Sequence, residues 1–440
     1  MKILSIVGAR PNFMKIAPFI RAIKKYNKEQ ENRNSKSIEH LLVHTGQHYD
    51  VRMSESFFKS LGIPDPDINL EIGSGSHAEQ VGNTMMAIEK VLIEEKPDWI
   101  VVVGDVNATL ACSVAAKKLH IKVCHIEAGL RSNDERMPEE INRLVTDRLS
   151  DLLLTPDKLS IQNLRKEGVP DTKIQFTGNI MIDTLEANRN KAWQLEIEDI
   201  IKNNLIDNQT LNHSSIQSFN HSSIQPETRN SKPETPHLPT ANRQLPTENQ
   251  SEIRNPKPEI QSYALMTLHR PSNVDDKQIF QPIMRFLMDE ATKDMPLIWP
   301  IHPRTQKQLQ NFGLWDEVLG NENLILLHPL GYHDMLKLNM EAKIMLTDSG
   351  GLQEECTVLG TPCLTLRWNT ERPVTLREHG GASVLVGNNI QRIRNEYRKT
   401  LSLQRKPERP ELWDGKTAER CVKAIVEAGR DERREMRDER

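Results

Sequence analysis

The stretch IMLTDSGGLQEE, residues 344–355, has the form of a buried strand that runs directly into a helix. Residues 344–347 are largely apolar, which is typical of a parallel strand covered by helices on both faces. Ser349 suits the N-cap of the helix, and Gly350 and Gly351 leave the amide groups of its first turn open to a ligand. A strand followed at once by a helix is the repeating unit of an α/β fold.

The same alternation of short apolar runs and longer amphipathic runs recurs on both sides of this stretch. In the first half of the chain we expect strands at 3–7, 41–44, 99–103, 122–126, 152–155 and 174–177, with helices such as 15–25 and 108–119 between them. In the second half we expect strands at 263–268, 297–301, 324–327, 344–347 and 362–366. This rhythm predicts two Rossmann-like domains with a cleft between them.

Composition divides the chain into segments. We expect an N-terminal domain over 1–185, a connecting helix over 186–207 and a C-terminal domain over 262–405. Residues 208–261 are polar and contain the hexapeptide NHSSIQ twice, and they are predicted to be a disordered insertion. A shorter polar insert, 27–39, separates the first helix from the second strand. A helix at about 415–430 is expected to pack back onto the first domain, ahead of a charged tail over 431–440.

The bulk composition excludes several classes of protein. Lys and Arg total 58 against 61 Asp and Glu, and this balance argues against a chain that coats nucleic acid or an anionic membrane. No stretch approaches the roughly 20 apolar residues of a membrane span. Arg10, Asn12 and Lys15 break the apolar start, so it is predicted to be a strand and not a secretion signal. Five scattered cysteines suit a reduced, cytoplasmic protein and form no zinc template.

Ligands of open α/β sheets bind at the carboxyl ends of the strands, so the residues there are the first candidates. The turn at Ser349, Gly350 and Gly351 suits a phosphate at the positive end of a helix, and Glu355 could accept hydrogen bonds from ribose hydroxyls. The alternative is an ordinary strand–helix turn, which also favours Ser and Gly. The position at the sheet edge favours phosphate, although no Gly-Lys-Ser/Thr follows and the turn is not a P-loop.

Cationic side chains follow other predicted strands. Arg10 and Lys15 lie at the start of a helix, where the helix dipole disfavours cations, and this misfit favours a role in neutralising a diphosphate. Arg372 follows the strand at 362–366 and would face the cleft, unless it is a solvated loop charge. His269 follows the first strand of the second half and His302 the next, although a lone histidine is more often structural.

Carboxylates follow two neighbouring strands of the first half. Asp105 comes after the strand at 99–103 and Glu127 after the strand at 122–126, while Glu139 and Arg143 share one face of a predicted helix at i,i+4. Carboxylates gathered in a cleft raise one another's pKa and become candidates for general acid and base. For Glu139 and Arg143, a surface ion pair is an equally good interpretation.

Six motifs in this order resemble those of the non-hydrolysing UDP-N-acetylglucosamine 2-epimerases: GARPNFMKIAP, GDVNATL, HIEAGLRS with MPEEINR, TLHRPSN, LTDSGGLQEE and NTERP. The resemblance covers both halves and implies two Rossmann-like domains of the GT-B type. It also implies a cytoplasmic homodimer that interconverts UDP-GlcNAc and UDP-ManNAc for polysaccharide or glycan synthesis, without a metal or redox cofactor. The implied UDP contacts are Arg10, His269, Ser349, Gly350, Gly351, Glu355 and Arg372, with Lys15 close by; the implied catalytic or sugar-binding group is Asp105, Glu127, Glu139 and Arg143.

The implied chemistry fits these residue types. Departure of UDP builds positive charge at C1 of the sugar, which acidifies the C2–H bond and permits elimination to a glycal. One carboxylate then removes the proton, and a second acid returns it on the other face. The sequence leaves the base unassigned, and a hydrolysing epimerase, a glycosyltransferase and a non-catalytic sensor remain alternatives. Relatives with an allosteric site carry glutamines and an arginine there; Gln47 is present, but 71–77 contains no arginine, so we do not expect activation.

Overall fold

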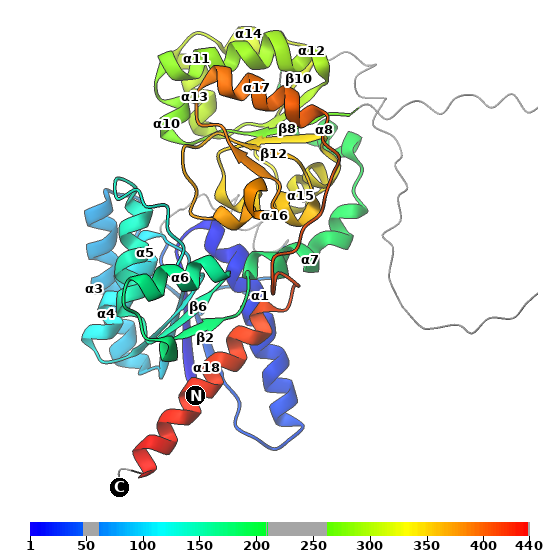
Figure 1. Ribbon diagram of the computed structural model, residues 1–440. Coiled ribbons are helices and arrows are strands. Elements are labelled where there is room, and N and C mark those ends of the chain that lie inside the picture. The colour runs from blue at the N-terminus through cyan, green and yellow to red at the C-terminus, as the bar shows by residue number, and fades with distance from the viewer. Residues whose placement is uncertain (47–60, 208, 210–261, 439–440) are drawn as a thin grey trace, which may run out of the picture.

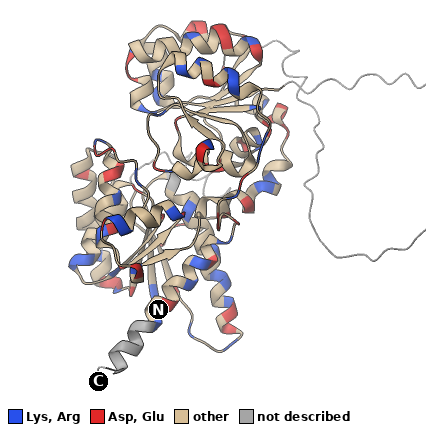
Figure 2. Ribbon diagram, viewed as in Figure 1, with Lys and Arg blue, Asp and Glu red and all other residues tan. Residues whose placement is uncertain are grey.

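The computed structural model describes residues 1–46, 61–207, 209 and 262–438, and it forms two lobes (Figure 1). Each lobe is a parallel sheet with helices on both faces, which confirms the predicted fold class. Lys and Arg are interspersed with Asp and Glu over both lobes (Figure 2). Of the helices that the structure describes, none combines the length and apolar character needed to cross a bilayer.

The first sheet has seven strands in the order β3-β2-β1-β4-β5-β6-β7, all in parallel. The strands are β1 (Lys2–Val7), β2 (Glu39–His44), β3 (Ile68–Asn69), β4 (Trp99–Val103), β5 (Lys122–Ile126), β6 (Leu152–Thr155) and β7 (Ile174–Phe176). The chain order reverses between β1 and β4, because β1 pairs with β2 on one side and with β4 on the other. Such a switch point opens a crevice at the carboxyl edge of the sheet.

Helices cover both faces of this sheet. They are α1 (Arg10–Glu31), α3 (His77–Glu95), α4 (Asn107–Lys118), α5 (Pro138–Leu149) and α6 (Lys158–Lys166), with a 3₁₀ turn at Asp171–Lys173. Side chains of α3 and α4 fill the core on one face, and side chains of α1 fill the core on the other. Helix α1 continues to Glu31, so the first residues of the predicted polar insert 27–39 are helical.

The second sheet has six parallel strands in the order β10-β9-β8-β11-β12-β13, with its switch point between β8 and β11. The strands are β8 (Ala264–Thr267), β9 (Leu297–Pro300), β10 (Leu324–Leu327), β11 (Ile344–Thr347), β12 (Cys363–Thr365) and β13 (Ser383–Leu385). The helices are α10 (Pro271–Val274), α11 (Lys277–Phe286), α12 (Thr292–Asp294), α13 (Pro303–Asn311), α14 (Trp315–Leu319), α15 (Tyr332–Glu341), α16 (Gly350–Leu359) and α17 (Ile390–Leu401), with a π turn at Leu287–Ala291 and 3₁₀ turns at Pro373–Thr375 and Arg377–His379.

Two connections join the lobes. The segment 186–207, predicted as one helix, contains the end of α7 (Ile180–Trp193) and all of α8 (Ile197–Asn204). The helix breaks because α8 turns to bury Ile197, Ile200 and Ile201 against the second sheet. The chain later returns through 402–416 to α18 (Thr417–Asp438), which packs against α1 of the first lobe (Figure 1).

A buried carboxylate fixes the start of α18. Asp183 of α7 accepts hydrogen bonds from Thr417 N at 3.0 Å and Ala418 N at 2.7 Å, which satisfies two amides of the first turn of α18. Burial raises the pKa of Asp183 to about 6. The last helix is therefore tied to the helix that leaves the first lobe.

Candidate active site

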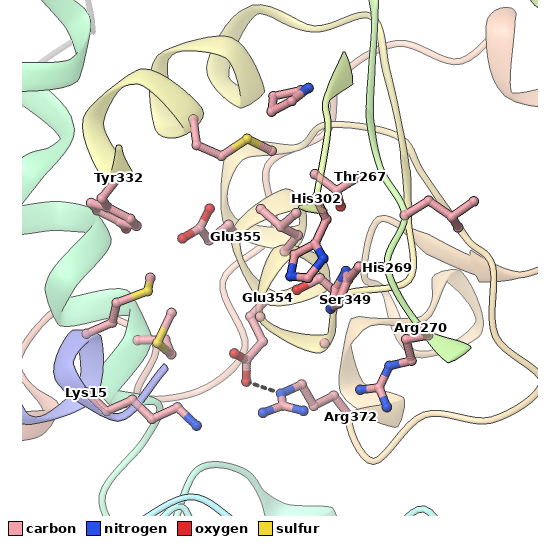
Figure 3. Close-up of a pocket in the computed structure, with 18 of the residues that line it drawn as sticks. Lys15, Thr267, His269, Arg270, His302, Tyr332, Ser349, Glu354, Glu355 and Arg372 are labelled. Carbon is pink, nitrogen blue, oxygen red and sulfur yellow. Dashed lines mark hydrogen bonds and ion pairs between the residues drawn. The ribbon is translucent and has the colours of Figure 1, made fainter. Parts of the chain in front are cut away.

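A pocket of about 480 Å³ lies between the two lobes, at the carboxyl edges of both sheets (Figure 3). Most of the residues singled out from the sequence line it: Lys15, Asp105, Glu139, Arg143, His269, His302, Ser349, Gly350, Gly351, Glu355 and Arg372. Arg10 is the first residue of α1, but its side chain lies outside what the structure describes. Glu127 is buried beside the pocket and is not part of its wall.

The N-terminus of α16 forms one side of the pocket. Ser349 occupies the N-cap position but makes no capping hydrogen bond with its side chain, contrary to the expectation from the sequence; its own amide donates to Thr347 Oγ1 at 3.0 Å. A side chain at Gly350 would place its Cβ 2.7 Å from both Arg372 Nη1 and Glu371 Oε1. An alanine at position 350 would therefore displace the Arg372 guanidinium and the Glu371 carboxylate from the start of the helix.

Asp348 orients the two residues that follow β8. Its Oδ2 accepts from His269 N at 2.9 Å and Arg270 N at 2.7 Å, and its Oδ1 lies 2.9 Å from Nδ1 of the His269 ring. Burial acts to raise the pKa of Asp348, but these hydrogen bonds outweigh it and lower the pKa below its usual value. The His269 ring faces the pocket beside His302, with 5.3 Å between the ring centroids (Figure 3).

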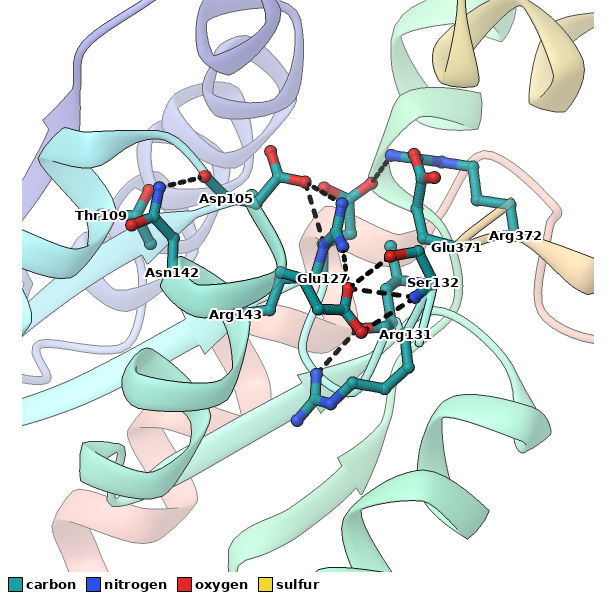
Figure 4. Close-up of polar contacts among 12 residues, drawn as sticks. Asp105, Thr109, Glu127, Arg131, Ser132, Asn142, Arg143, Glu371 and Arg372 are labelled. Atoms are coloured by element: carbon teal, nitrogen blue, oxygen red, sulfur yellow. Dashed lines mark hydrogen bonds and ion pairs between the residues drawn. The ribbon is translucent and has the colours of Figure 1, made fainter. Parts of the chain in front are cut away.

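Arg372 is held by carboxylates from both lobes. Its Nε donates to Glu354 Oε1 at 2.8 Å, its Nη1 donates to Glu371, and its Nη2 donates to Glu127 Oε1 in the first lobe at 3.1 Å (Figure 4). These carboxylates hold the pKa of Arg372 well above its usual value, although burial acts to lower it. Glu127 also pairs with Lys15, so a chain of charges crosses the interface between the lobes.

Arg143 pairs with two carboxylates other than Glu139. Its Nε and Nη2 donate to Asp105 Oδ2 at 3.0 and 2.7 Å, and its Nη1 donates to Glu140 at i,i+3 (Figure 4). Glu140 is fixed because it accepts from the Ser132 amide and hydroxyl. The surface ion pair between Glu139 and Arg143, which was the alternative interpretation of their spacing, is not among the contacts of the arginine, and both side chains line the pocket.

The carboxyl groups of the site fall into two classes. Burial acts to raise the pKa of Asp105, but Arg143, Lys15 and Arg372 lower it below its usual value, so Asp105 is ionised at neutral pH. Burial raises the pKa of Glu354 and of Glu355 to about 7. Carboxyl groups whose pKa values are pushed apart in one cleft are suited to separate acid and base roles.

Sequence reasoning missed several members of the site. Glu354 lines the pocket, accepts from Asn179 Nδ2 at 2.8 Å, and has its Oε2 buried with no hydrogen-bond partner in the described part of the chain. Glu371 lines it as well, directly before Arg372. Tyr332 contributes a buried hydroxyl that lies against the carboxyl group of Glu355. In the sequence, the one indication for these two glutamates is their position: Glu354 directly precedes Glu355, and Glu371 directly precedes Arg372.

Comparison with known proteins settles the family. A family model described as UDP-N-acetylglucosamine 2-epimerase matches residues 30–215 and 236–426, which is most of the chain. The chain belongs to this family. The resemblance found from the six motifs is thereby confirmed, and the unmatched internal stretch, 216–235, lies within the predicted insertion. Residues 208 and 210–261, and Gln47, lie outside the described residues.

Several relatives in this epimerase family match over nearly their whole length. The UDP-N-acetylglucosamine 2-epimerase of Methanocaldococcus jannaschii is 36% identical, covering 97% of this chain and 99% of the relative. The UDP-2,3-diacetamido-2,3-dideoxy-D-glucuronate 2-epimerase of Pseudomonas aeruginosa is also 36% identical, covering 88% of each chain. Among solved structures, the M. jannaschii enzyme in complex with UDP-GlcNAc and UDP has a TM-score of 0.77 at 36% identity, covering 97% of this chain and 99% of that one.

A second epimerase structure supports the same architecture. The Neisseria meningitidis enzyme bound to UDP-GlcNAc has a TM-score of 0.73 at 27% identity, and the match covers 97% of this chain and 100% of that one. The match therefore includes both lobes and the cleft between them.

Proposed function

We propose that the chain is an isomerase that interconverts UDP-N-acetylglucosamine and UDP-N-acetylmannosamine at C2 of the sugar. The observation that carries this proposal is the pocket between the lobes, which has a helix N-terminus suited to phosphate on one wall and the carboxylates Asp105 and Glu139 on the other. The relatives named for this epimerisation support the same assignment.

The second lobe would hold the nucleotide. The amides at Ser349, Gly350 and Gly351 suit the diphosphate, and Arg372 lies against them with its guanidinium (Figure 3). Glu355, one turn further into α16, would accept hydrogen bonds from the ribose hydroxyls. His269 is oriented by Asp348 so that it can donate to the departing phosphate. In this arrangement the leaving group stays bound and returns as the nucleophile.

The first lobe would carry out the proton transfer. The C1–O bond breaks with its electron pair going to UDP, a carboxylate removes the C2 proton, and the electrons of the C2–H bond form the C1=C2 double bond of a glycal. Proton return to the opposite face and attack by UDP at C1 complete the epimerisation. Asp105 is the better-supported base because its neighbouring cations keep it ionised, and Glu139 is the second carboxylate on the same wall.

Isotope exchange tests this function. Incubation with UDP-GlcNAc in deuterated water should place deuterium at C2 of intact UDP-ManNAc, as read by mass spectrometry. Release of free ManNAc and UDP would identify a hydrolysing epimerase, and transfer to an added acceptor sugar would identify a glycosyltransferase. If no deuterium is exchanged, the protein is a sensor that binds the nucleotide-sugar without turnover. The variant Asp105→Asn should abolish exchange while UDP still binds. A parallel incubation with UDP-2,3-diacetamido-2,3-dideoxy-D-glucuronate distinguishes the two substrate classes of the relatives.

We further infer that the enzyme is a cytoplasmic homodimer, and that its product feeds polysaccharide or glycan synthesis. Support for self-association comes from apolar side chains left exposed on α3 and α5, the two helices of the first lobe that flank α4. On α3, Met86 is 61% and Ile93 56% exposed, and on α5, Ile141 is 49% exposed. Sedimentation equilibrium should give twice the mass of the chain, and a monomer at micromolar concentration would contradict the proposal.

A further inference from the structure

A buried histidine–aspartate pair lies behind the proposed reaction centre. His125 is on β5 and Asp147 on α5, with 0% and 2% of their surfaces exposed. Nδ1 of His125 lies 2.6 Å from Oδ1 of Asp147. Neither side chain lines the pocket. The epimerisation chemistry proposed above therefore gives them no direct role.

The histidine reaches the turn that carries Asp105. Its Nε2 lies 2.9 Å from the carbonyl oxygen of Gly104, the residue directly before Asp105. Gly104 has φ +69°, and its amide donates to Ile126 O at 3.2 Å. The carbonyl oxygen and the amide of Gly104 are thus both bound by residues of β5. These contacts fix the backbone of the turn and therefore the position of Asp105, the next residue.

The aspartate reaches the turn that carries Glu127. Its Oδ2 accepts from Gly129 N at 3.0 Å and lies 2.7 Å from Arg131 Nη1. Glu127 and Gly129 have φ of 75° and 83°, and for glutamate a positive φ is a strained conformation that the surroundings must hold in place. Asp147 also lies on α5, the helix that contributes Glu139 and Arg143 to the pocket wall.

Both ring nitrogens of His125 face acceptors. A carbonyl oxygen only accepts hydrogen bonds, so Nε2 donates to Gly104. Burial acts to raise the pKa of Asp147, but His125 and Arg131 lower it below its usual value. The ring therefore bridges a carboxyl group on α5 and a carbonyl oxygen in the Asp105 turn, and both of its contacts hold turns of the reaction centre.

We propose that His125 and Asp147 form a positioning pair that fixes the Asp105 turn relative to the Glu127 turn and thereby sets the geometry of proton transfer at C2. This inference rests on the proposed epimerase function. A purely structural pair would contribute to stability alone, whereas a positioning pair controls the turnover of enzyme that is already folded. Loosening it should lower kcat about tenfold to a hundredfold, as small misplacements of reacting groups do. Nucleotide affinity should hold, because the proposed UDP contacts lie on the other lobe.

Two substitutions separate the two bonds of the imidazole. His125→Gln keeps a donor near the Nε2 position and hence the contact with Gly104, while His125→Asn keeps a donor near Nδ1 and hence the contact with Asp147. We expect His125→Asn to lose more of kcat than His125→Gln, with KM and the Kd for UDP changed less than about threefold in both. His120→Gln, an exposed position in the same lobe, is the matched control. Asp147→Asn should also lose kcat.

The measurements are kcat and KM for UDP-GlcNAc, calorimetric Kd for UDP, thermal midpoint, and ¹⁵N NMR of the His125 ring. Wild-type kcat in folded His125→Asn and Asp147→Asn, or parallel losses in kcat and UDP affinity, would overturn the proposal. If the substitutions prevent folding, the wild-type spectrum decides, because a ring N–H that exchanges freely with solvent would show that the contacts with Asp147 and Gly104 are not held, and this would overturn the proposal. Failure of the epimerase function itself is distinguishable, since the wild type would then show no exchange at C2.

Discussion

Glu354 and Glu355 should give nucleotide binding two opposite pH dependences. The two residues are neighbours on α16, both line the pocket, and burial raises the pKa of each to about 7. Glu355 is the proposed acceptor for ribose hydroxyls, which bind the ionised carboxylate, so the complex favours loss of its proton. Glu354 lies beside Arg372, where the diphosphate would arrive, so the complex favours the protonated, neutral form.

The magnitude follows from these pKa values. A group with a pKa of about 7 is roughly one-tenth ionised at pH 6 and nine-tenths ionised at pH 8. If binding requires ionised Glu355, the apparent Kd falls about tenfold from pH 6 to pH 8; if it requires protonated Glu354, the Kd rises by about the same factor. The two effects largely cancel in the wild type.

Single substitutions separate the two effects. In Glu354→Gln only the Glu355 dependence remains, and the Kd should fall by at most about tenfold between pH 6 and pH 8, because burial still raises the pKa of Glu355 after the charge of Glu354 is removed. In Glu355→Gln the Kd should rise over the same range. Calorimetry with UDP-GlcNAc on an Asp105→Asn background provides the measurement, because both phosphates are esterified and the ligand itself does not titrate in this range. A Glu355→Gln variant whose Kd still falls with pH would refute the ribose assignment.

Two further predictions concern anchoring contacts. Asp183→Ala should lower the free energy of unfolding by about 1–3 kcal/mol, because two amides of α18 lose their acceptor. Thermal or urea unfolding measures this loss. The control is Glu419→Gln, which removes an exposed ion pair and should leave the unfolding midpoint unchanged. Gly350→Ala should raise the Kd for UDP at least about tenfold because its Cβ displaces Arg372. Gly351→Ala, whose Cβ would meet only a methionine Cε at 3.9 Å, should cost less, and equal losses would contradict the steric reasoning.

The fold was largely predictable because most strands are short, fully buried apolar runs. β4, β5, β6, β10 and β11 have the bounds expected from the sequence. The strands that were missed, β3 and β13, contain two and three residues, which is too short to produce a readable pattern. Their strand character comes from pairing with β2 and β12, and that information is not local.

The sequence predicts the site residues that directly follow the ends of strands. It is less informative about contacts that depend on the direction in which a side chain points. The strand-end rule placed Asp105, His269 and Ser349 at one pocket. It could not show that Arg143 selects Glu140 over Glu139, since that choice depends on how Ser132 anchors the carboxylate. The contact of Arg372 with Glu127 joins residues 245 positions apart, and no pattern within the sequence encodes it.

The return of α18 to the first lobe has a consequence for synthesis of the chain. Cys421, Val422 and Ile425 belong to the same core as α1 and the face of β1 that it covers. About 250 residues separate the end of β7 from Ile425, so at about 5–20 residues per second the first lobe waits roughly 12 to 50 s for its last helix. The second lobe emerges complete before then. The N-terminal half of the protein is therefore the last to finish folding, and during that interval the apolar side chains of α1 that α18 covers stay exposed to solvent and to chaperones.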